Sequence, residues 1–179
     1  VTSNLKGFNP VLVNGRPLKA INQYFNKKRD KLQSQLKGKA QTSNRIKALT
    51  HKRNCKVNNY LHNASHYVVN WLLQHKIGTL IIGKNEGWKQ EINIGSRNNQ
   101  NFVNIPHATF IEMLVYKSEL AGISVLVREE SYTSKCSFLD NEPIEKHEKY
   151  KGRRIKRGLF KTAEGKLINA DVNGSLNII

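Results

Sequence analysis

Three of the few acidic side chains in this sequence stand where a metal-dependent nuclease would need them. Glu129 and Glu130 directly follow a predicted strand at residues 123–127, and Asp171 opens a predicted helix near the end of the chain. Two divalent cations that clamp the attacking and leaving oxygens of a phosphodiester need convergent carboxylates from strand ends and a helix. The spacing alone is equally compatible with two simpler roles: Glu130 as a solvent-exposed charge at a strand end, and Asp171 as the N-cap of its helix.

The apolar patterning predicts the elements that would position these acids. Residues 78–83 and 123–127 are short apolar runs, typical of strands buried on both faces. A predicted helix precedes each of them: residues 43–75, whose apolar side chains share one face, and residues 106–121. This helix–strand–helix–strand order favours an α/β domain with a parallel pair of strands in its sheet.

The remaining segments are less regular. Residues 8–17 contain an apolar stretch ending in Asn14-Gly15, which favours a strand and a tight hairpin turn at a sheet edge. A helix is predicted after Pro17, with Gly38 as its stop. Residues 132–165 show no strong period and are predicted to be basic loop, before a last short helix at 171–179. Because the chain opens on Val1 at what resembles the end of a strand, we expect it to be a fragment.

The charge of the chain requires a polyanionic partner. Thirty lysines and arginines face thirteen acids, for a formal charge of +17, and residues 1–76 hold fifteen of those bases with Asp30 as their one acid. A second basic run occupies residues 149–157, and two such regions could each follow a phosphate backbone. The candidate contacts to nucleic acid are Lys27, Lys28, Arg29, Lys52, Arg53, Lys56, Arg153, Arg154, Lys156 and Arg157.

Composition also excludes several classes of protein. A chain of 179 residues with 38% hydrophobic content is expected to form one domain. No apolar run approaches the length of a membrane span and no secretory signal is present, so we expect a soluble cytoplasmic protein with no membrane partner. The two cysteines form no C-x-x-C pair, and a row of His51, Cys55, His62 and His66 extends over too much helix for one zinc ion.

The aromatic residues leave one alternative open. Trp71 falls on the apolar face of the predicted helix at residues 43–75 and is expected in the core. Trp88 lies between Lys84 and Lys89, where its ring could stack on a base or anchor the loop.

Three segments together carry a resemblance to a known family. Residues 158–178 (GLFKTAEGKLINADVNGSLNI) resemble the carboxy-terminal motif of TnpB (OrfB) proteins of transposons, in which N-A-D-x-N-x-x-x-N-I supplies the last acid of a RuvC-like nuclease. Residues 129–134 (EESYTS) resemble the family's Tyr-Thr-Ser segment after a strand, and residues 83–90 (GKNEGWKQ) are similar to a variant in one branch. The resemblance covers nearly the whole chain.

The resemblance implies an RNase H-like fold, cleavage of DNA directed by a transposon-derived guide RNA, and Mg²⁺ or Mn²⁺ as cofactor, in a family ancestral to type V CRISPR effectors. Asp171 matches the last acid of that family. The first acid belongs to a D-x-G-type segment that would precede Val1. The usual second acid falls at Gly83, so we take Glu130 as the relocated acid, with Glu86 as the fallback and loss of the acid as the inactive alternative.

The family also often folds two C-x-x-C pairs around zinc between the Tyr-Thr-Ser segment and the last acid. Only Cys136 stands near the first pair and residues 161–165 offer no cysteine, so zinc is not expected. The predicted organisation is a partial RuvC-like domain over residues 1–179 with a degenerate zinc-ribbon-like insertion at about 135–166. The leading hypothesis is an RNA-guided DNA endonuclease. The alternative is a catalytically dead remnant that still binds nucleic acid, and the oligomeric state is left open.

Overall fold

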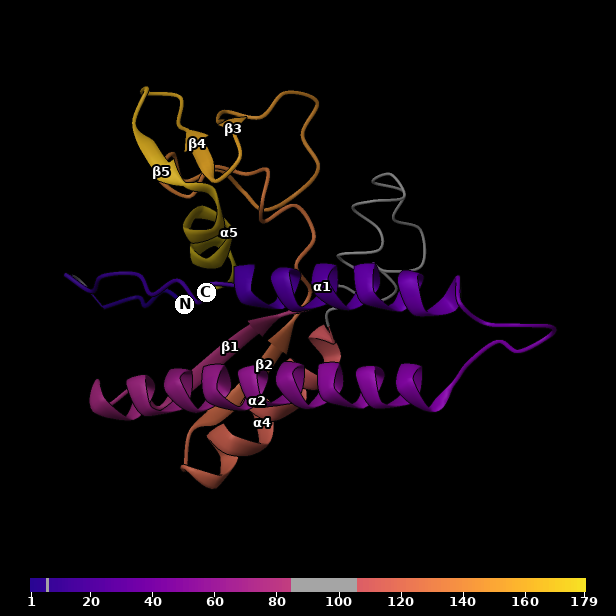
Figure 1. Ribbon diagram of the computed structural model, residues 1–179. Helices are drawn as coiled ribbons and strands as arrows, with labels where there is room; N and C mark the ends of the chain where they lie inside the picture. The colour runs from indigo at the N-terminus through magenta and orange to yellow at the C-terminus, as the bar shows by residue number, and fades with distance from the viewer. Residues whose placement is uncertain (6, 85–105) are drawn as a thin grey trace. The chain divides into compact units, whose positions relative to one another are not determined.

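The fold is mixed α/β, and its described residues divide into two compact units (Figure 1). A computed structural model describes residues 1–5, 7–84 and 106–179. The strand unit consists of Val1–Leu12, Ile77–Trp88 and Ile123–Ile179, and the helical unit of Val13–Lys76 and Lys89–Gly122. Element labels follow Figure 1.

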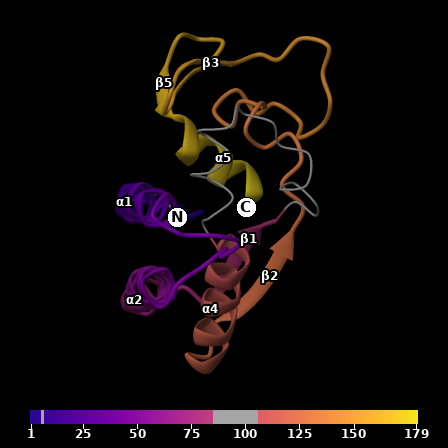
Figure 2. The same ribbon diagram turned by 45° about the vertical axis from the view of Figure 1, so that its right-hand side comes forward.

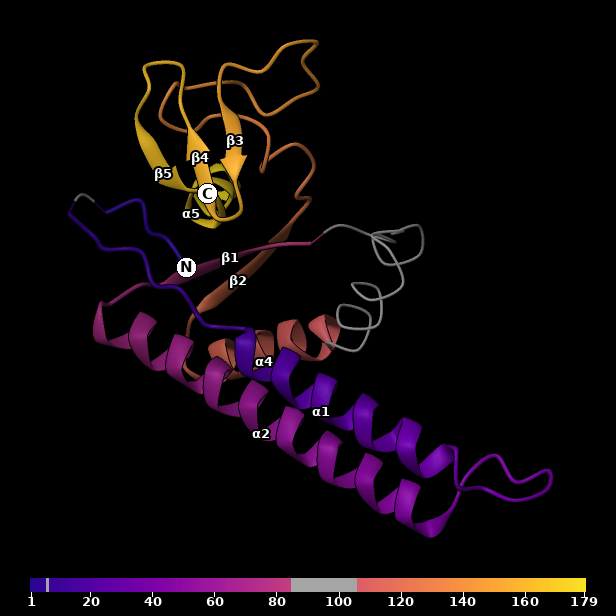
Figure 3. The same cartoon turned by 45° about the horizontal axis from the view of Figure 1, so that its top comes forward.

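The helical unit is built from three helices. Helices α1 (Arg16–Gln33) and α2 (Asn44–Gln74) form an antiparallel hairpin, and α4 (His107–Leu120) packs against α2 (Figure 3). All three were predicted, within a few residues at each end. Their apolar faces meet in a core that contains Leu18, Val57, Leu61 and Met113, with Ile21, Tyr60 and Phe110 packed beside it.

Polar contacts reinforce this helical packing. The Arg53 guanidinium of α2 donates from Nε and Nη2 to Oδ1 of Asn22 in α1, at 2.9 and 2.7 Å, and Asn22 is 1% exposed. Lys117 of α4 donates to the Ser65 hydroxyl of α2 at 2.7 Å. Burial lowers the pKa of both Arg53 and Lys117.

The strand and hairpin turn predicted for residues 8–17 are wrong. Gly15 is instead the N-cap of α1, and the Asn14 side chain accepts a hydrogen bond from the backbone N–H of Arg16 at 3.0 Å. Asn-Gly therefore initiates a helix here, because Pro17 in the first turn fixes helical geometry directly after it. Upstream, Val1 and Val11 exchange two backbone hydrogen bonds without forming an assigned strand.

In the strand unit the predicted parallel pair is confirmed. Strand β1 (Thr79–Gly83) pairs in parallel with β2 (Ser124–Arg128), in a register that runs from Thr79 opposite Ser124 to Gly83 opposite Arg128. Leu80 and Ile82 of β1 are buried, but Leu126 and Val127 of β2 are 48% and 53% exposed. The prediction that β2 is buried on both faces is wrong, because among the described residues its only sheet partner is β1.

A second sheet lies where basic loop was predicted. Strands β3 (Arg153–Lys156), β4 (Leu159–Lys161) and β5 (Leu167–Asn169) form an antiparallel meander (Figure 3), of which β3 and β5 are also labelled in Figure 2. The prediction was wrong here because the strands have three or four residues and β3 is exposed along its length, so no apolar period marks it. The sheet buries Phe160, which is 1% exposed and occupies the space beside Gly152.

The last predicted helix is confirmed as α5 (Ala170–Ile178), which contacts both sheets of the strand unit. It follows β5 directly, contacts β4 and β5, and also contacts β1 (Figure 1). Its N-cap is Asn169, whose side chain accepts hydrogen bonds from the backbone N–H groups of Asp171 and Val172 at 2.9 and 3.2 Å.

Candidate functional site

Glu130 occupies the space that a side chain at position 83 would need. Gly83 ends β1, and a Cβ atom built on it would come within 3.3 Å of both Cγ and Cδ of Glu130. The same Cβ would lie 2.6 Å from Cδ1 of Ile178 in α5. The acid that follows β2 therefore lies at the carboxyl end of β1, beside Gly83, the position at which the resemblance in sequence predicted an acid.

The surroundings of Glu130 differ from those of its neighbour Glu129. The Glu130 side chain is half-buried, and this burial raises the pKa of its carboxyl. The backbone carbonyl of Glu130 accepts a hydrogen bond from the Thr133 hydroxyl at 2.9 Å. This bond holds the turn that follows β2. Glu129 is exposed and accepts the Ser131 hydroxyl at 2.5 Å. Of the two acids, Glu130 is the one directed toward β1.

Asp171 lies in the first turn of α5 with an exposed side chain. The N-cap role that its position allowed belongs to Asn169 instead. A carboxylate in the first helical turn is favoured by the partial positive charge of the helix amino end. Asp171 therefore has a solvent-facing carboxylate on a well-capped helix.

The carboxy-terminal motif also contains two asparagines whose role the sequence did not reveal. Asn173 donates to the Cys136 carbonyl at 2.8 Å and accepts the Phe138 N–H at 3.1 Å. Asn177, one turn later, donates to the carbonyls of Thr133 and Cys136, both at 2.8 Å. Both asparagines are buried, and together they fasten α5 to the segment that follows Glu130. Two asparagines four residues apart, and therefore on one face of a short helix, were the signal.

The structure brings one end of α5 to the strand ends. Ile178 reaches Gly83, and Asp171 lies seven residues earlier, about 10 Å along the helix axis at 1.5 Å per residue. Among residues 1–5, 7–84 and 106–179, no three His, Cys, Asp or Glu side chains cluster closely enough to hold a metal ion. Glu86 and Trp88 lie outside the described residues.

The basic candidates form two groups. In the helical unit, Lys27, Lys28, Lys52 and Lys56 are exposed and Arg29 is half-buried, whereas Arg53 is held against Asn22. In the strand unit, β3 and the turn after it present Arg153, Arg154, Lys156 and Arg157, all exposed. Exposed cations along a helix pair and along a strand are suited to contacts with a phosphate backbone.

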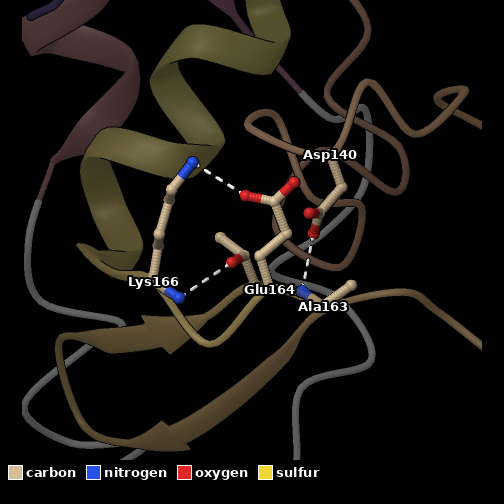
Figure 4. A network of polar contacts seen from close by, with 5 residues as sticks. Asp140, Ala163, Glu164 and Lys166 are labelled. Carbon is tan, nitrogen blue, oxygen red and sulfur yellow. Dashed lines mark hydrogen bonds and ion pairs between the residues drawn. The ribbon is translucent and has the colours of Figure 1, made fainter.

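Hydrogen bonds hold together the loops in the region where the related family binds zinc. The buried carboxylate of Glu142 accepts the backbone N–H groups of Ser137 and Lys151, each at 2.7 Å. Asp140 accepts the N–H of Ala163 at 2.8 Å and so joins its loop to the turn between β4 and β5 (Figure 4). Cys136 is fully buried, its thiol donates to the Glu145 carbonyl at 3.7 Å, and burial raises its pKa.

The row of histidines and cysteine on α2 lies on the protein surface. His51, Cys55, His62 and His66 are exposed, with His51 3.5 Å from the Cys55 sulfur. Trp71 is half-buried and packs on His75, with ring centroids 4.6 Å apart, so it is less enclosed than a core position implies. No helix in the described part of the chain is long and apolar enough to cross a membrane.

Two family descriptions match the chain in succession. The OrfB_IS605 family, described as "Probable transposase", matches residues 2–89, and the Cas12f1-like TNB domain matches residues 107–178. No significant match to a curated protein was found. The Cas12f1 protein in the cryo-EM structure of a Cas12f1–sgRNA–target DNA complex is similar over 97% of this chain, with a TM-score of 0.71 and 20% sequence identity.

At that identity the similarity concerns the fold, and the chain spans 44% of the Cas12f1 chain. The two family matches cover the segments on either side of residues 90–106, and the second includes both Glu130 and Asp171. The chain therefore belongs to the TnpB/OrfB type of transposon-encoded proteins, with a Cas12f1-like TNB domain in its second half.

Proposed function

We propose that this chain is the later part of a RuvC-like nuclease that cuts DNA under the direction of a transposon-derived guide RNA. The observation that carries the proposal is the Glu130 carboxyl beside Gly83, because the acid missing from β1 is replaced from the neighbouring strand at the same sheet edge. The partial domain would have the RNase H-like fold, to which the parallel pair β1–β2 and helix α5 belong.

The available donors suit a hard divalent cation. Glu130 and Asp171 would contribute carboxylate oxygens, the ligands that Mg²⁺ and Mn²⁺ prefer. When bound, such ions stabilise negative charge on the phosphodiester oxygens and generate the attacking hydroxide. Glu130 must be ionised to take part. Asn173 and Asn177 hold the segment at residues 133–138 that follows it.

The exposed cations would hold the substrate and the guide. Those of α1 and α2 and those of β3 belong to different units, so each group can contact phosphates of its own. Residues 135–166 would act as a zinc-ribbon-like insertion without metal, in which Glu142 and Asp140 make the loop contacts that zinc makes elsewhere.

The first test measures Mn²⁺ binding and DNA cleavage by the protein that contains this chain, supplied with RNA encoded beside its gene. Glu130→Gln and Asp171→Asn should each weaken Mn²⁺ binding about tenfold or more and abolish cleavage. Glu129→Gln is the matched control, because its carboxylate is adjacent but exposed, and it should behave as wild type. Cleavage retained by either substituted protein contradicts the assignment.

The pH dependence provides a second readout. Because burial raises the pKa of Glu130, its proton competes with the cation, and Mn²⁺ affinity should decrease as the pH falls through that raised pKa. In Glu130→Gln this part of the pH dependence should disappear. Nucleic-acid binding that persists while Mn²⁺ binding is absent at every pH would support the inactive remnant instead.

A relocation of the acid can be reversed by design. Gly83→Asp combined with Glu130→Ala places the carboxylate back on β1 and vacates the space it needs there, apart from the movable Cδ1 end of Ile178. The double variant should recover Mn²⁺ binding lost in Glu130→Ala alone. Failure to recover, in a protein whose circular dichroism matches wild type, contradicts the equivalence of the two positions.

A further inference from the structure

A groove runs between α1 and α2 on the surface of the helical unit. Its main hollow has a volume of about 370 Å³, large enough for a small organic ligand. Tyr24 and Phe25 of α1 contribute its aromatic wall, and Lys52 and Lys56 of α2 contribute two exposed ammonium groups. Apolar ring faces and cations thus line one concave surface.

The groove continues past Tyr24 into a second hollow of about 290 Å³. Tyr24 and Leu49 belong to the walls of both hollows, and Lys28 and Lys31 of α1 supply the charge of the second. Tyr24 is 59% exposed and lines both hollows, and each hollow has its own lysines. This alternation of ring and cation fits a chain of bases linked by phosphates.

We propose that this groove binds an unpaired nucleotide of single-stranded nucleic acid, with its base stacked on Tyr24 and its flanking phosphates on Lys52 and Lys56. The charge of the surroundings favours this ligand over a peptide or a neutral molecule. Among the described residues no acid lines either hollow, and in the first 76 residues the one acid is Asp30. A base-paired strand has no free ring face to offer Tyr24, so the site selects unpaired positions.

The base of the groove is already ordered, which reduces the cost of binding. The Arg53 guanidinium carbon lies 5.9 Å from the Phe25 ring centroid while its nitrogens donate to the buried Asn22. On the rim, the Lys28 ammonium lies 5.9 Å from the centroid of the Tyr24 ring, one helical turn away. Phe25 and Arg53 therefore form a fixed floor, and Tyr24 and the lysines are the accessible contacts.

The test uses fluorescence anisotropy of the whole chain in EDTA, so that it is independent of any nuclease activity. The probes are twelve-nucleotide strands of uridine or thymidine, a strand of the same length made entirely of abasic nucleotides, and a blunt duplex. Tyr24→Leu should weaken binding to the RNA strand, the DNA strand or both by about tenfold or more, and leave the abasic strand unchanged. The strand with the larger loss identifies the source of the nucleotide.

Two variants serve as matched controls. Tyr67→Leu removes an equally exposed tyrosine (55%) from α2 outside the groove and should leave every affinity unchanged. Tyr24→Phe keeps the ring and should bind like wild type. Cross-linking of an iodouridine strand to wild type should modify Tyr24, as mapped by peptide mass spectrometry. An equal loss for intact and abasic strands, no loss with Tyr24→Leu, or cross-linking elsewhere overturns the proposal.

Discussion

The helical unit and the strand unit differ in how far polar side chains join their elements. The helical unit has buried polar contacts such as Arg53 to Asn22, but these lie beside an apolar core. In α1 and α2 nearly all charged groups face solvent, and an apolar core of Leu18, Val57, Leu61 and Met113 holds the helices together. In the strand unit, buried polar side chains join segments through hydrogen bonds to the backbone. Asn173 and Asn177 bind the segment after Glu130, and the Glu142 carboxylate accepts two backbone N–H groups.

This difference determines how each unit responds to substitution. A surface that binds phosphates through many exposed lysines loses affinity in small steps, while its folding is unaffected. A loop held by buried hydrogen bonds depends on single side chains, because removing one leaves its partners unsatisfied away from water. We therefore expect stability effects to concentrate in the strand unit and binding effects to be distributed over the helical unit.

The largest effect on stability is expected for Asn173→Ala. The change removes one of the two donors to the Cys136 carbonyl and the acceptor of the Phe138 N–H, from a side chain that is 0% exposed. It should lower the free energy of unfolding by about 2–4 kcal/mol. Urea unfolding measures the loss, and hydrogen exchange should show faster exchange at residues 133–138. The control is Asn70→Ala on the exposed face of α2, and equal destabilisation by both would break the comparison.

A smaller effect is expected for Gly152→Ala. The added Cβ would lie 2.3 Å from Cε1 of Phe160 and 3.1 Å from the Lys161 carbonyl oxygen, in the small sheet of β3–β5. Overpacking of this kind costs about 1–3 kcal/mol. Thermal unfolding of the variant should show the loss, and Gly152→Ala with Phe160→Leu should recover part of it. Gly78→Ala, whose Cβ would meet nothing within 4 Å, is the control without a clash.

The smallest effect on stability is expected when Lys52 and Lys56 are both changed to Gln. Both side chains are exposed, so the free energy of unfolding should remain within about 0.5 kcal/mol of wild type. Binding should change instead: the slope of log affinity against log salt for single-stranded DNA should decrease by about 1.4, at 0.7 per phosphate contact. An unchanged slope would show that neither lysine meets a phosphate, and a large loss of stability would contradict the division between the units.

Much of the fold followed from local patterns in the sequence. Apolar residues at helical spacing located α1, α2 and α4, and two short apolar runs located β1 and β2 with their parallel pairing. The strands β3–β5 were missed, because each has only three or four residues and, apart from the buried Phe160, all of these are exposed or half-exposed and form no apolar period. Asn14-Gly15 was misassigned to a hairpin, since the same dipeptide precedes helices when the following residues favour them.

The candidate site was predicted only in its parts. Glu130 and Asp171 were recognised from their positions after a strand and in a family motif, and both assignments remain predictions. The contact between Glu130 and Gly83 depends on the register of β1 and β2 and on the turn after β2. A local sequence pattern predicts neither the register nor the turn. The capping role possible for Asp171 went to Asn169, because the helix begins one residue earlier.

The sequence by itself determined the family, the excess of positive charge and the elements with a clear apolar period, because each depends on residue identity and spacing alone. Tertiary structure decided which polar side chains are buried. Asn173, Asn177 and Glu142 are buried, although the residues around them in the sequence are equally compatible with exposed positions. Their burial is tolerated because backbone groups from distant segments satisfy them, and those partners meet only when the chain is folded.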